Sequence, residues 1–367
     1  MIYLDYSATT KADKRVIDLF VKDNENLFAN PNSIHGSGLE SKKSIDAASK
    51  EILEILSLED YEMVYTSGAT ESNNLAIKGI AYKNDTRKHI ISTSFEHSSV
   101  VACLNYLSKM GYEVDIVEND EYGLVDLESL KELINENTCL VSIGAVNSET
   151  GIVQDLKSIS DIVRNNKDTV FHSDMTQAIG KIRIDFSLAD LISFSGHKIY
   201  GLKGVGGLLV KNKVKLVPII HGGKSTSPLR AGTPATPLML SLRNSLKFMY
   251  ENFDMKLSVI KDNHDYFIEK TLSLPNTVIN SNKFSLNQII NVSFLDIPSH
   301  KLHHEMSKRN IYISTSTACS SNDEKSLIIE RLTGSEVLAE TSVRISISHL
   351  TTKEEIDQFF TAYKEIL

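Results

Sequence analysis

The sequence has no tryptophan, only three cysteines and seven prolines in 367 residues, and no long apolar run. A membrane-spanning helix needs about 20 predominantly apolar residues in succession, so the chain is not expected to span a bilayer. Cys103, Cys139 and Cys319 are odd in number and widely separated. They therefore indicate reduced thiols rather than a disulfide framework. Cys103 and Cys139 fall in a predicted helix and a predicted strand, where packing is the expected role.

An excess of positive charge is also missing. The net charge is −8 and the isoelectric point is about 5.8. A protein that binds nucleic acid through its phosphates needs a basic face, so the composition argues against nucleic-acid binding. Residues 1–6 lack the basic region and the apolar run of a secretory signal, so we expect a cytoplasmic protein.

The length and the hydrophobic pattern predict a two-domain α/β protein. A chain of 367 residues is longer than one ordinary compact core. From residue 62 onward, short β-rich runs alternate with helix-period stretches, which is typical of a sheet covered by helices on both faces. The expected strands are 62–66, 89–94, 112–117, 139–143, 169–172, 191–194 and 207–210, and the expected helices between them include 67–82, 97–109 and 156–165.

The pattern changes after a long helical stretch without proline at 238–272, which we expect to connect the two domains. Beyond it, strands at 288–294, 311–314 and 341–346 and helices at 299–308 and from about 351 indicate a smaller α+β unit. The expected division is an N-terminal segment, 1–14, packed with the small domain, then a large cofactor-binding domain, 15–255, and a small C-terminal domain, 256–367, that carries the Cys319 loop.

An amine, a carboxylate and several anion donors occur together in the large domain. Lys198 ends the run 195–198, which also holds Ser195 and His197, and Asp174 and Gln177 lie upstream. Pyridoxal phosphate needs an amine for its Schiff base, a carboxylate that keeps its pyridine nitrogen protonated, and donors for its phosphate. The set therefore predicts a pyridoxal phosphate site. By itself, Asp174 has a second interpretation as a solvated turn residue.

Two further segments fit the same cofactor. Residues 66–70 follow a strand and open a helix, so free N–H groups and the helix dipole favour a phosphate there. The alternative is an ordinary capping box made by Ser67, Thr70 and Glu71. His97 begins a helix and is interpreted either as a cap or as a proton-transferring residue against the cofactor ring, because its ordinary pKa is near neutrality.

Seven motifs occur in a consistent order over nearly the whole chain, at 3–10, 66–72, 96–97, 174–177, 193–201, 230–233 and 318–320. In this order they resemble the motifs of the cysteine desulfurases, class-V aminotransferases of the fold-type-I pyridoxal phosphate enzymes. The resemblance implies that fold: a large domain with a mainly parallel mixed sheet flanked by helices, and a smaller α+β C-terminal domain.

The resemblance also implies residue roles. Lys198 holds the cofactor, Asp174 its ring nitrogen, Gln177 its phenolate oxygen and His97 its ring face. Arg344 binds the substrate carboxylate, for which its planar fork is suited. The phosphate is bound by Ala69, Thr70, Ser195, His197 and, from the other subunit of a homodimer, Thr233.

Cys319 lies in a loop rich in serine and threonine. The resemblance implies that its thiolate takes the sulfur of L-cysteine, which leaves L-alanine and a persulfide, and that the loop carries the sulfur to an acceptor protein. Iron–sulfur cluster assembly, tRNA thiolation and thiocofactor synthesis are all compatible destinations. The sequence does not select one of them.

The chain also departs from the family pattern. Ser148 stands where the family usually has an asparagine that contacts cofactor and substrate, and Met175 replaces an alanine beneath the ring. These changes leave open a selenocysteine lyase, another class-V lyase or aminotransferase, and a scaffold without catalysis. His300, His303 and His304 are expected on a solvated helix face, so no metal site is predicted.

Overall fold

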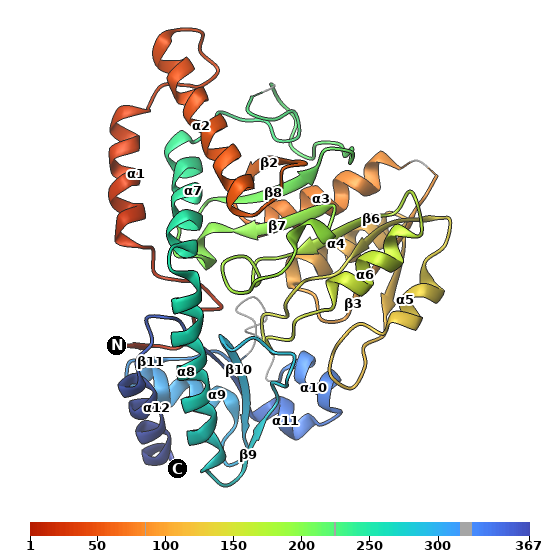
Figure 1. Cartoon of the computed structure of the whole chain (residues 1–367). Helices are drawn as coiled ribbons and strands as arrows, with labels where there is room; N and C mark the ends of the chain where they lie inside the picture. The colour runs from red at the N-terminus through yellow and green to blue at the C-terminus, as the bar shows by residue number, and fades with distance from the viewer. Residues whose placement is uncertain (85, 224, 316–324) are drawn as a thin grey trace.

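The structure is a computed structural model that describes residues 1–84, 86–223, 225–315 and 325–367. Figure 1 shows a larger part built around a broad sheet and a smaller part below it, joined by two consecutive helices. None of the helices in the described ranges is both long and apolar enough to cross a membrane.

The large part contains a seven-stranded sheet of order β2-β8-β7-β6-β5-β3-β4. Neighbouring strands from β7 to β4 run parallel, whereas β8 is antiparallel to both β7 and β2. The predicted mainly parallel mixed sheet is therefore confirmed. The strands are β2 Tyr61–Thr66, β3 His89–Thr93, β4 Glu113–Val117, β5 Thr138–Ser142, β6 Val170–Asp174, β7 Leu191–Ser195 and β8 Gly206–Lys211.

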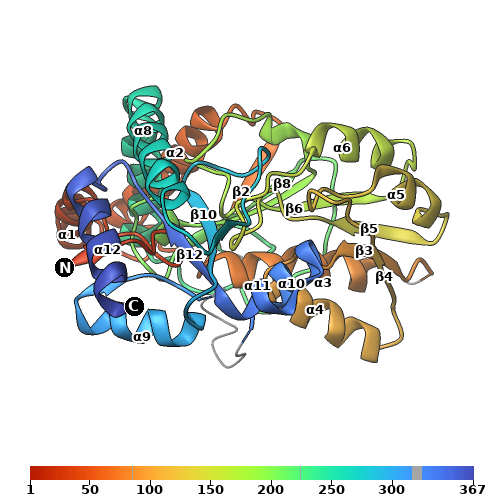
Figure 2. The ribbon, with the colours of Figure 1, turned by 90° about the horizontal axis from the view of Figure 1, so that it is seen from below.

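Helices cover both faces of this sheet (Figure 2). Leu140 and Leu191 pack with α3 and α4, whereas their neighbours Val141 and Ile192 pack with α2, α6 and α7 on the opposite face. A strand that is buried on both sides needs apolar side chains in both directions, which explains the unbroken apolar runs in the sequence. The helices of the large part are α1 Lys14–Asn26, α2 Gly36–Ile55, α3 Ala69–Lys83, α4 Ser98–Lys109, α5 Leu127–Leu133, α6 Leu156–Arg164 and α7 Thr236–Tyr250.

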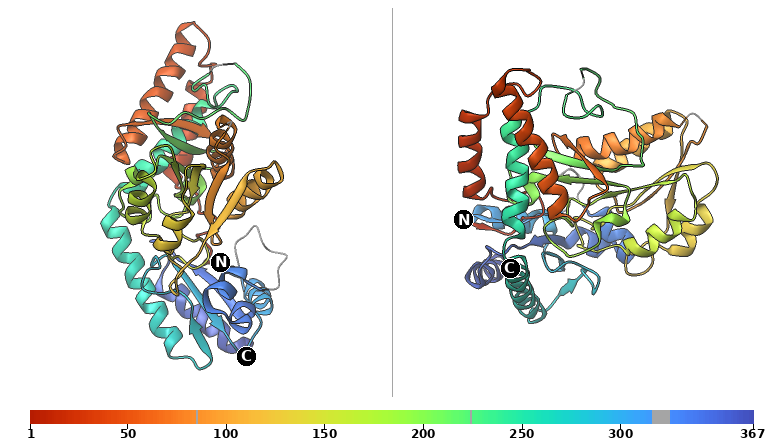
Figure 3. Two further views of the ribbon diagram at one scale, coloured as in Figure 1. Left: turned by 90° about the vertical axis from the view of Figure 1, so that its right-hand side faces the viewer. Right: turned by 45° about the horizontal axis from the view of Figure 1, so that its top comes forward.

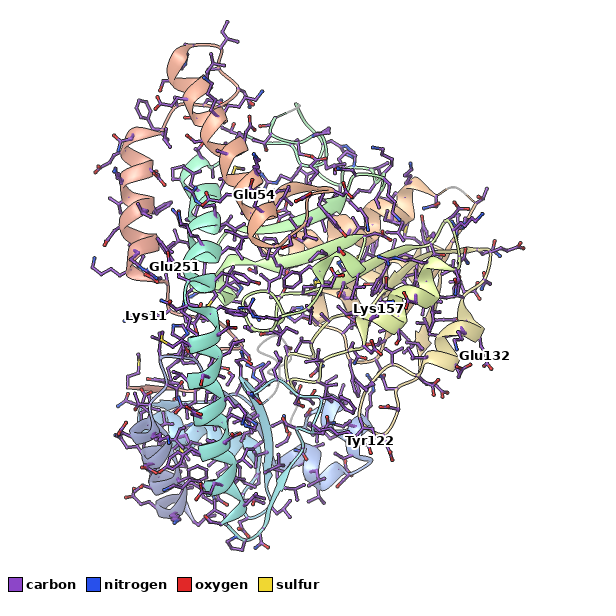
Figure 4. All side chains as sticks on the ribbon, viewed as in Figure 1. Lys11, Glu54, Tyr122, Glu132, Lys157 and Glu251 are labelled. Carbon is purple, nitrogen blue, oxygen red and sulfur yellow. The ribbon has the colours of Figure 1, made fainter. Side chains whose placement is uncertain are left out.

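The long helical stretch predicted at 238–272 consists of two consecutive helices. Asn252 separates α7 from α8, Phe253–Leu272, and its φ of 52° is left-handed. A right-handed helix does not continue through that conformation, which asparagine adopts more readily than most residues. Glu251 lies at the break (Figure 4), where its Oε2 accepts a 2.8 Å hydrogen bond from Nη1 of Arg15.

The small part is α+β, as predicted. Strand β10 pairs antiparallel with β9 and β12, and β1 at the start of the chain pairs parallel with β11. Its strands are β1 Ile2–Tyr3, β9 Thr277–Ile279, β10 Ile289–Phe294, β11 Ile311–Tyr312 and β12 Ser342–Ser346, and its helices are α9 Ser299–Lys308, α10 Leu327–Thr333, α11 Glu336–Thr341 and α12 Lys353–Ile366.

The N-terminal segment shares a hydrophobic core with the small part. Ile2 and Leu4 pack in one cluster with Phe267 of α8 and Phe359 of α12. Both chain termini accordingly lie in this part of the molecule (Figure 3). This packing supports the proposed division into a large domain and a small domain to which the first residues belong.

Candidate active site

A cavity of about 450 Å³ lies at the C-terminal ends of the parallel strands, the edge at which open α/β sheets bind ligands. Strand β6 ends at Asp174, β7 ends at Ser195, and His97 follows β3. The predicted site residues that line the cavity are Ala69, Thr70, His97, Ser148, Asp174, Gln177, Ser195, His197, Lys198 and Arg344. The fold thus brings both parts of the chain to one cavity.

Lys198 enters the cavity from a short 3₁₀ turn, Gly196–Lys198, directly after β7. Its Nζ donates a 2.8 Å hydrogen bond to the backbone oxygen of Ser7. The N-terminal segment is fixed over this turn, because the N–H of Thr10 donates to the carbonyl oxygen of His197 at 2.8 Å. A primary amine is therefore held at the cavity wall by neighbouring backbone.

Asp174 is partly buried and hydrogen-bonded rather than a solvated turn residue. Its Oδ2 accepts a 2.7 Å bond from Nδ2 of Asn73, and its Oδ1 accepts a 2.9 Å bond from the N–H of Thr176. His97 lines the same cavity and also caps α4, since its Nδ1 accepts from the N–H of Ser99 at 3.2 Å. The cap interpretation of His97 is therefore confirmed, and its role against the cofactor ring stays a prediction.

Helix α3 begins at the cavity without a side-chain cap. Its N-cap is Gly68, and the nearby Oε2 of Glu71 instead accepts a 2.7 Å bond from the N–H of Ser67. The full capping box is therefore absent. Ser195 is close by, because a Cβ built on Gly68 would lie 3.5 Å from its Oγ. The helix N-terminus, with its dipole, offers an anion site at this end of the cavity.

The Gln177 side chain has a fixed orientation. Nζ of Lys181 donates to its Oε1, and its Nε2 donates a 2.9 Å bond to the backbone oxygen of Ser7. Because a backbone carbonyl oxygen only accepts, the NH₂ group must face Ser7, and the amide oxygen then faces Lys181. Burial, and next the charge of Lys198, hold the pKa of Lys181 well below its ordinary value.

Arg344 is 1% exposed and connects the small part to the cavity. Its Nη2 donates a 2.7 Å bond to Oδ1 of Asp5, and its Nη1 donates a 2.9 Å bond to the backbone oxygen of Ser148. Its buried Nε has no hydrogen-bond partner among the described residues. The guanidinium is therefore held in place with N–H groups left for a further acceptor.

Burial sets the protonation of three other groups. It raises the pKa of Glu96 to about 8, although the N–H of Gly144 donates to its Oε1 at 2.8 Å. It lowers the pKa of His197 to about 4, with the charge of Lys198 acting in the same direction. It also lowers the pKa of His97, against the opposing effect of Asp174. Near neutral pH both histidines are uncharged.

Two residues named in the sequence analysis do not line the cavity, and a third cannot be placed relative to it. Thr233 is exposed and is not a lining residue. Cys319 falls outside the described residues. Met175 was expected beneath the cofactor ring, but it is fully buried in the core with Phe171 and Ile192 and does not line the cavity. That expectation is corrected, because the side chain points into the sheet–helix interface.

Sequence reasoning missed the roles of Asp5, Ser7, Asn73 and Lys181. Ser7 acts through its backbone oxygen, which no side-chain pattern reveals. Asp5 and Asn73 lie far in sequence from Arg344 and Asp174, and only the fold brings each pair together. Lys181 did leave a signal, since it stands four residues after Gln177.

A model of the family "Aminotransferase class-V" matches residues 2–359. The mitochondrial cysteine desulfurase of Saccharomyces cerevisiae is 38% identical over 99% of this chain and 74% of its own length. The chain belongs to the cysteine desulfurase family. The cysteine desulfurase IscS of Buchnera aphidicola subsp. Schizaphis graminum is 40% identical over 97% of this chain and 90% of its own length.

Solved structures agree with this membership. A NifS-like protein superposes with a TM-score of 0.92 at 31% identity, covering 100% of this chain and 98% of that protein. Cysteine desulfurases are pyridoxal phosphate enzymes, so the family predicted from the motifs, its fold and its enzymatic character are confirmed.

Proposed function

We propose that this protein is a pyridoxal phosphate-dependent cysteine desulfurase that converts L-cysteine to L-alanine and leaves the sulfur as a persulfide on Cys319. The C–S bond of the substrate breaks and an S–S bond forms, with no net oxidant or reductant required. The observation that carries the proposal is the convergence of Lys198, Asp174, His97 and Arg344 on one cavity in a member of this family.

The residues present fit the cofactor. The cavity has a volume in the range of small-molecule sites. It offers an amine at Lys198, a carboxylate at Asp174 and an uncapped helix N-terminus beside Ser195 for the phosphate. When bound, pyridoxal phosphate supplies an electron sink for the substrate Cα. Ala69, Thr70 and His197 complete the phosphate end, and the NH₂ of Gln177 serves the phenolate oxygen.

Substrate binding is assigned to Arg344. Two of its N–H groups are engaged by Asp5 and Ser148, and the remaining N–H groups suit a bidentate carboxylate. Ser148 lines the cavity and its backbone oxygen orients the guanidinium. Ser148 can therefore contribute to substrate binding through its backbone oxygen, although its side chain is shorter than that of asparagine.

The ends of the Cys319 segment support its role as sulfur acceptor. On one side, the N–H of Arg344 donates a 2.7 Å bond to the backbone oxygen of Ser314. On the other side, Oγ of Ser326 is hydrogen-bonded to Oε1 of Glu149, the residue after Ser148. Both ends are thus anchored beside the cavity walls that hold the substrate.

We further propose a homodimer in which Thr233 completes the phosphate site of the partner. Phe28 and Ile34 are 80% and 93% exposed, and exposed apolar side chains that form a patch mark interaction surfaces. They flank Asn32, whose Oδ1 accepts a 3.3 Å bond from Oγ of Ser225 in the segment that leads to Thr233. Mixing Lys198→Ala with Thr233→Ala chains should restore part of the activity only if Thr233 acts across the dimer.

The decisive experiment is mass spectrometry of the cofactor-loaded protein after incubation with L-cysteine, together with alanine assay. We expect one added sulfur on Cys319 and stoichiometric alanine. Cys319→Ser should lose the sulfur adduct, and Lys198→Ala should lose the visible absorbance of the bound cofactor. A protein that binds no pyridoxal phosphate would instead support the scaffold alternative.

Parallel assays distinguish the other candidates. Faster turnover of selenocysteine than of cysteine, with activity retained in Cys319→Ser, would support a selenocysteine lyase. The sulfur acceptor stays a prediction. The cytoplasmic location also stays a prediction, because the relatives include a mitochondrial protein. Capture of the persulfide by purified iron–sulfur scaffold or tRNA-thiolation proteins would identify the acceptor class.

A further inference from the structure

A continuous row of hydrogen bonds joins Asp174 to His97. Nδ2 of Asn73 donates to Oδ2 of Asp174 at 2.7 Å and to Oγ of Ser99 at 2.9 Å. Oγ of Ser99 lies 2.8 Å from Nδ1 of His97. Asn73 is 0% exposed and Ser99 is 8% exposed, so water does not compete readily for these bonds. Neither residue has an assigned role in the reaction.

The chemistry of the groups fixes the direction of every bond. A flipped Asn73 amide would place its oxygen against the carboxylate of Asp174, where two acceptors repel each other. Its NH₂ group must therefore supply both donors, which leaves its buried Oδ1 without a partner among the described residues. A buried unsatisfied oxygen is uncommon and indicates that the bonds made by the NH₂ group are favoured.

The directions of these hydrogen bonds also determine the tautomer of His97. Ser99 Oγ accepts from Asn73, so its single hydrogen is available for Nδ1 of His97. The backbone N–H of Ser99 also donates to this Nδ1, at 3.2 Å. Two donors at one ring nitrogen require that nitrogen to be unprotonated. The proton of the neutral ring is then on Nε2, at the opposite edge of the imidazole.

We propose that Asn73 and Ser99 are positioning residues that hold His97 in the tautomer with its proton on Nε2 and tie it to the carboxylate of Asp174. The inference rests on the proposed function, in which Asp174 faces the cofactor nitrogen and His97 its ring. With Nδ1 occupied, His97 presents an N–H donor at its other ring edge, and it accepts a second proton only by giving up these bonds.

The charges around His97 act together with these two donors. Burial lowers the pKa of His97, Asp174 raises it, and Lys198 lowers it. Glu96 is the preceding residue and faces the same cavity. The two Ser99 donors add to the effect of burial, because a proton on Nδ1 would face an N–H group. Removing the Ser99 hydroxyl is therefore expected to make His97 easier to protonate.

The test is nitrogen NMR of the full chain labelled with ¹⁵N-histidine, recorded before and after loading with pyridoxal phosphate. His97→Gln identifies the His97 signals among the 11 histidines. We expect the wild-type protein to show an unprotonated Nδ1 and a protonated Nε2. In Ser99→Ala the pKa of His97 should rise by roughly 0.5–1 unit, the effect of one lost hydrogen bond. Ser99→Thr should restore the wild-type value.

Ser193→Ala is the matched control. Its Oγ is hydrogen-bonded to Nε2 of a different buried histidine, His172, at 2.9 Å. This variant should alter the signals of His172 and leave those of His97 unchanged. An equal shift of His97 in both variants would show a non-specific effect and overturn the proposal. Asn73→Ala, which frees the Ser99 hydroxyl, should shift His97 in the same direction as Ser99→Ala.

The wild-type spectrum alone also decides the matter if the variants fold poorly. A proton on Nδ1 of His97 refutes the inference whether or not the protein desulfurates cysteine. A protein with the Nε2 tautomer but without alanine formation would retain the inference and refute the proposed function. In an active enzyme, the acidic limb of the pH profile of kcat/KM should move to higher pH in Ser99→Ala, by the same amount as the pKa measured by NMR.

Discussion

Asp5 places a negative charge beside Arg344, the arginine proposed to bind the substrate carboxylate. Its carboxylate accepts a hydrogen bond from Arg344. Among the described residues, the guanidinium makes one further hydrogen bond, from Nη1 to the backbone oxygen of Ser148. Asp5→Ala should leave the buried guanidinium poorly oriented. We expect KM for L-cysteine to rise roughly tenfold, equivalent to about 1.4 kcal/mol, with a much smaller change in kcat.

Asp5→Asn is the matched control, because its amide oxygen still accepts from Nη2. It should recover most of the wild-type KM. Steady-state kinetics of both variants, with the cofactor content checked by absorbance, make the comparison. An unchanged KM in Asp5→Ala would mean that Ser148 alone orients the arginine.

Glu96 makes stability depend on pH. Its pKa is raised from 4.5 to about 8, chiefly by burial. Above pH 4.5 the unfolded chain releases this proton while the folded chain keeps it, so this group lowers stability as the pH rises to about 8. In Glu96→Gln, the free energy of unfolding in urea should fall less between pH 4.5 and about 8 than in the wild-type protein. The exposed Glu113→Gln should retain the wild-type slope, and equal slopes in all three proteins would contradict the prediction.

At the scale of elements, β8 lies close to the start of α3, where the phosphate is proposed to bind. A Cβ on Gly206 would lie 2.6 Å from the carbonyl oxygen of Phe194 and 2.7 Å from Cα of Gly68. Gly206→Ala must therefore displace the α3 N-terminus or β7. We expect a loss of about 1–3 kcal/mol in unfolding free energy and weaker cofactor retention.

Gly36→Ala provides the control, because a Cβ there meets nothing within 4 Å. Denaturant unfolding and titration with pyridoxal phosphate measure the two effects. Normal cofactor affinity in Gly206→Ala would show that the close approach of β8 to α3 does not define the phosphate site.

Elements were predictable where the local pattern was strong. The helix Ser299–Lys308 appears with the predicted bounds, and the strands of the large sheet lie within one or two residues of their expected positions. The break at Asn252 was missed, because the apolar spacing continues through it and only the backbone turns. Helices α1 and α2 were also not predicted. They gain their contacts from α7, more than 180 positions away in the sequence.

At the scale of the molecule, the first residues connect the two parts. Leu4 is fully buried in the small core, its N–H donates to Tyr312 and its carbonyl oxygen accepts from the N–H of Ser346. Three residues later, the Ser7 oxygen holds Lys198. Leu4→Ala should lower the unfolding free energy by about 2–5 kcal/mol. The segment that contacts Lys198 should then become less ordered. We therefore expect slower cofactor binding.

Leu350→Ala serves as the control, since Leu350 is 51% exposed and its truncation should change stability by at most about 0.5 kcal/mol. Thermal unfolding and stopped-flow cofactor binding compare the two variants. A destabilised Leu4→Ala protein with unchanged binding kinetics would separate the small core from the organisation of the site.

The sequence by itself determined the family and the α/β class, and it predicted the set of reactive residues. These follow from the kinds of side chain and their order, which are local properties of the chain. The tertiary structure decided how those groups are held: Asp5 on Arg344, Ser7 on Lys198, and Asn73 between Asp174 and Ser99. Such contacts join positions up to 339 residues apart. They depend on how buried surfaces meet, which no local pattern encodes.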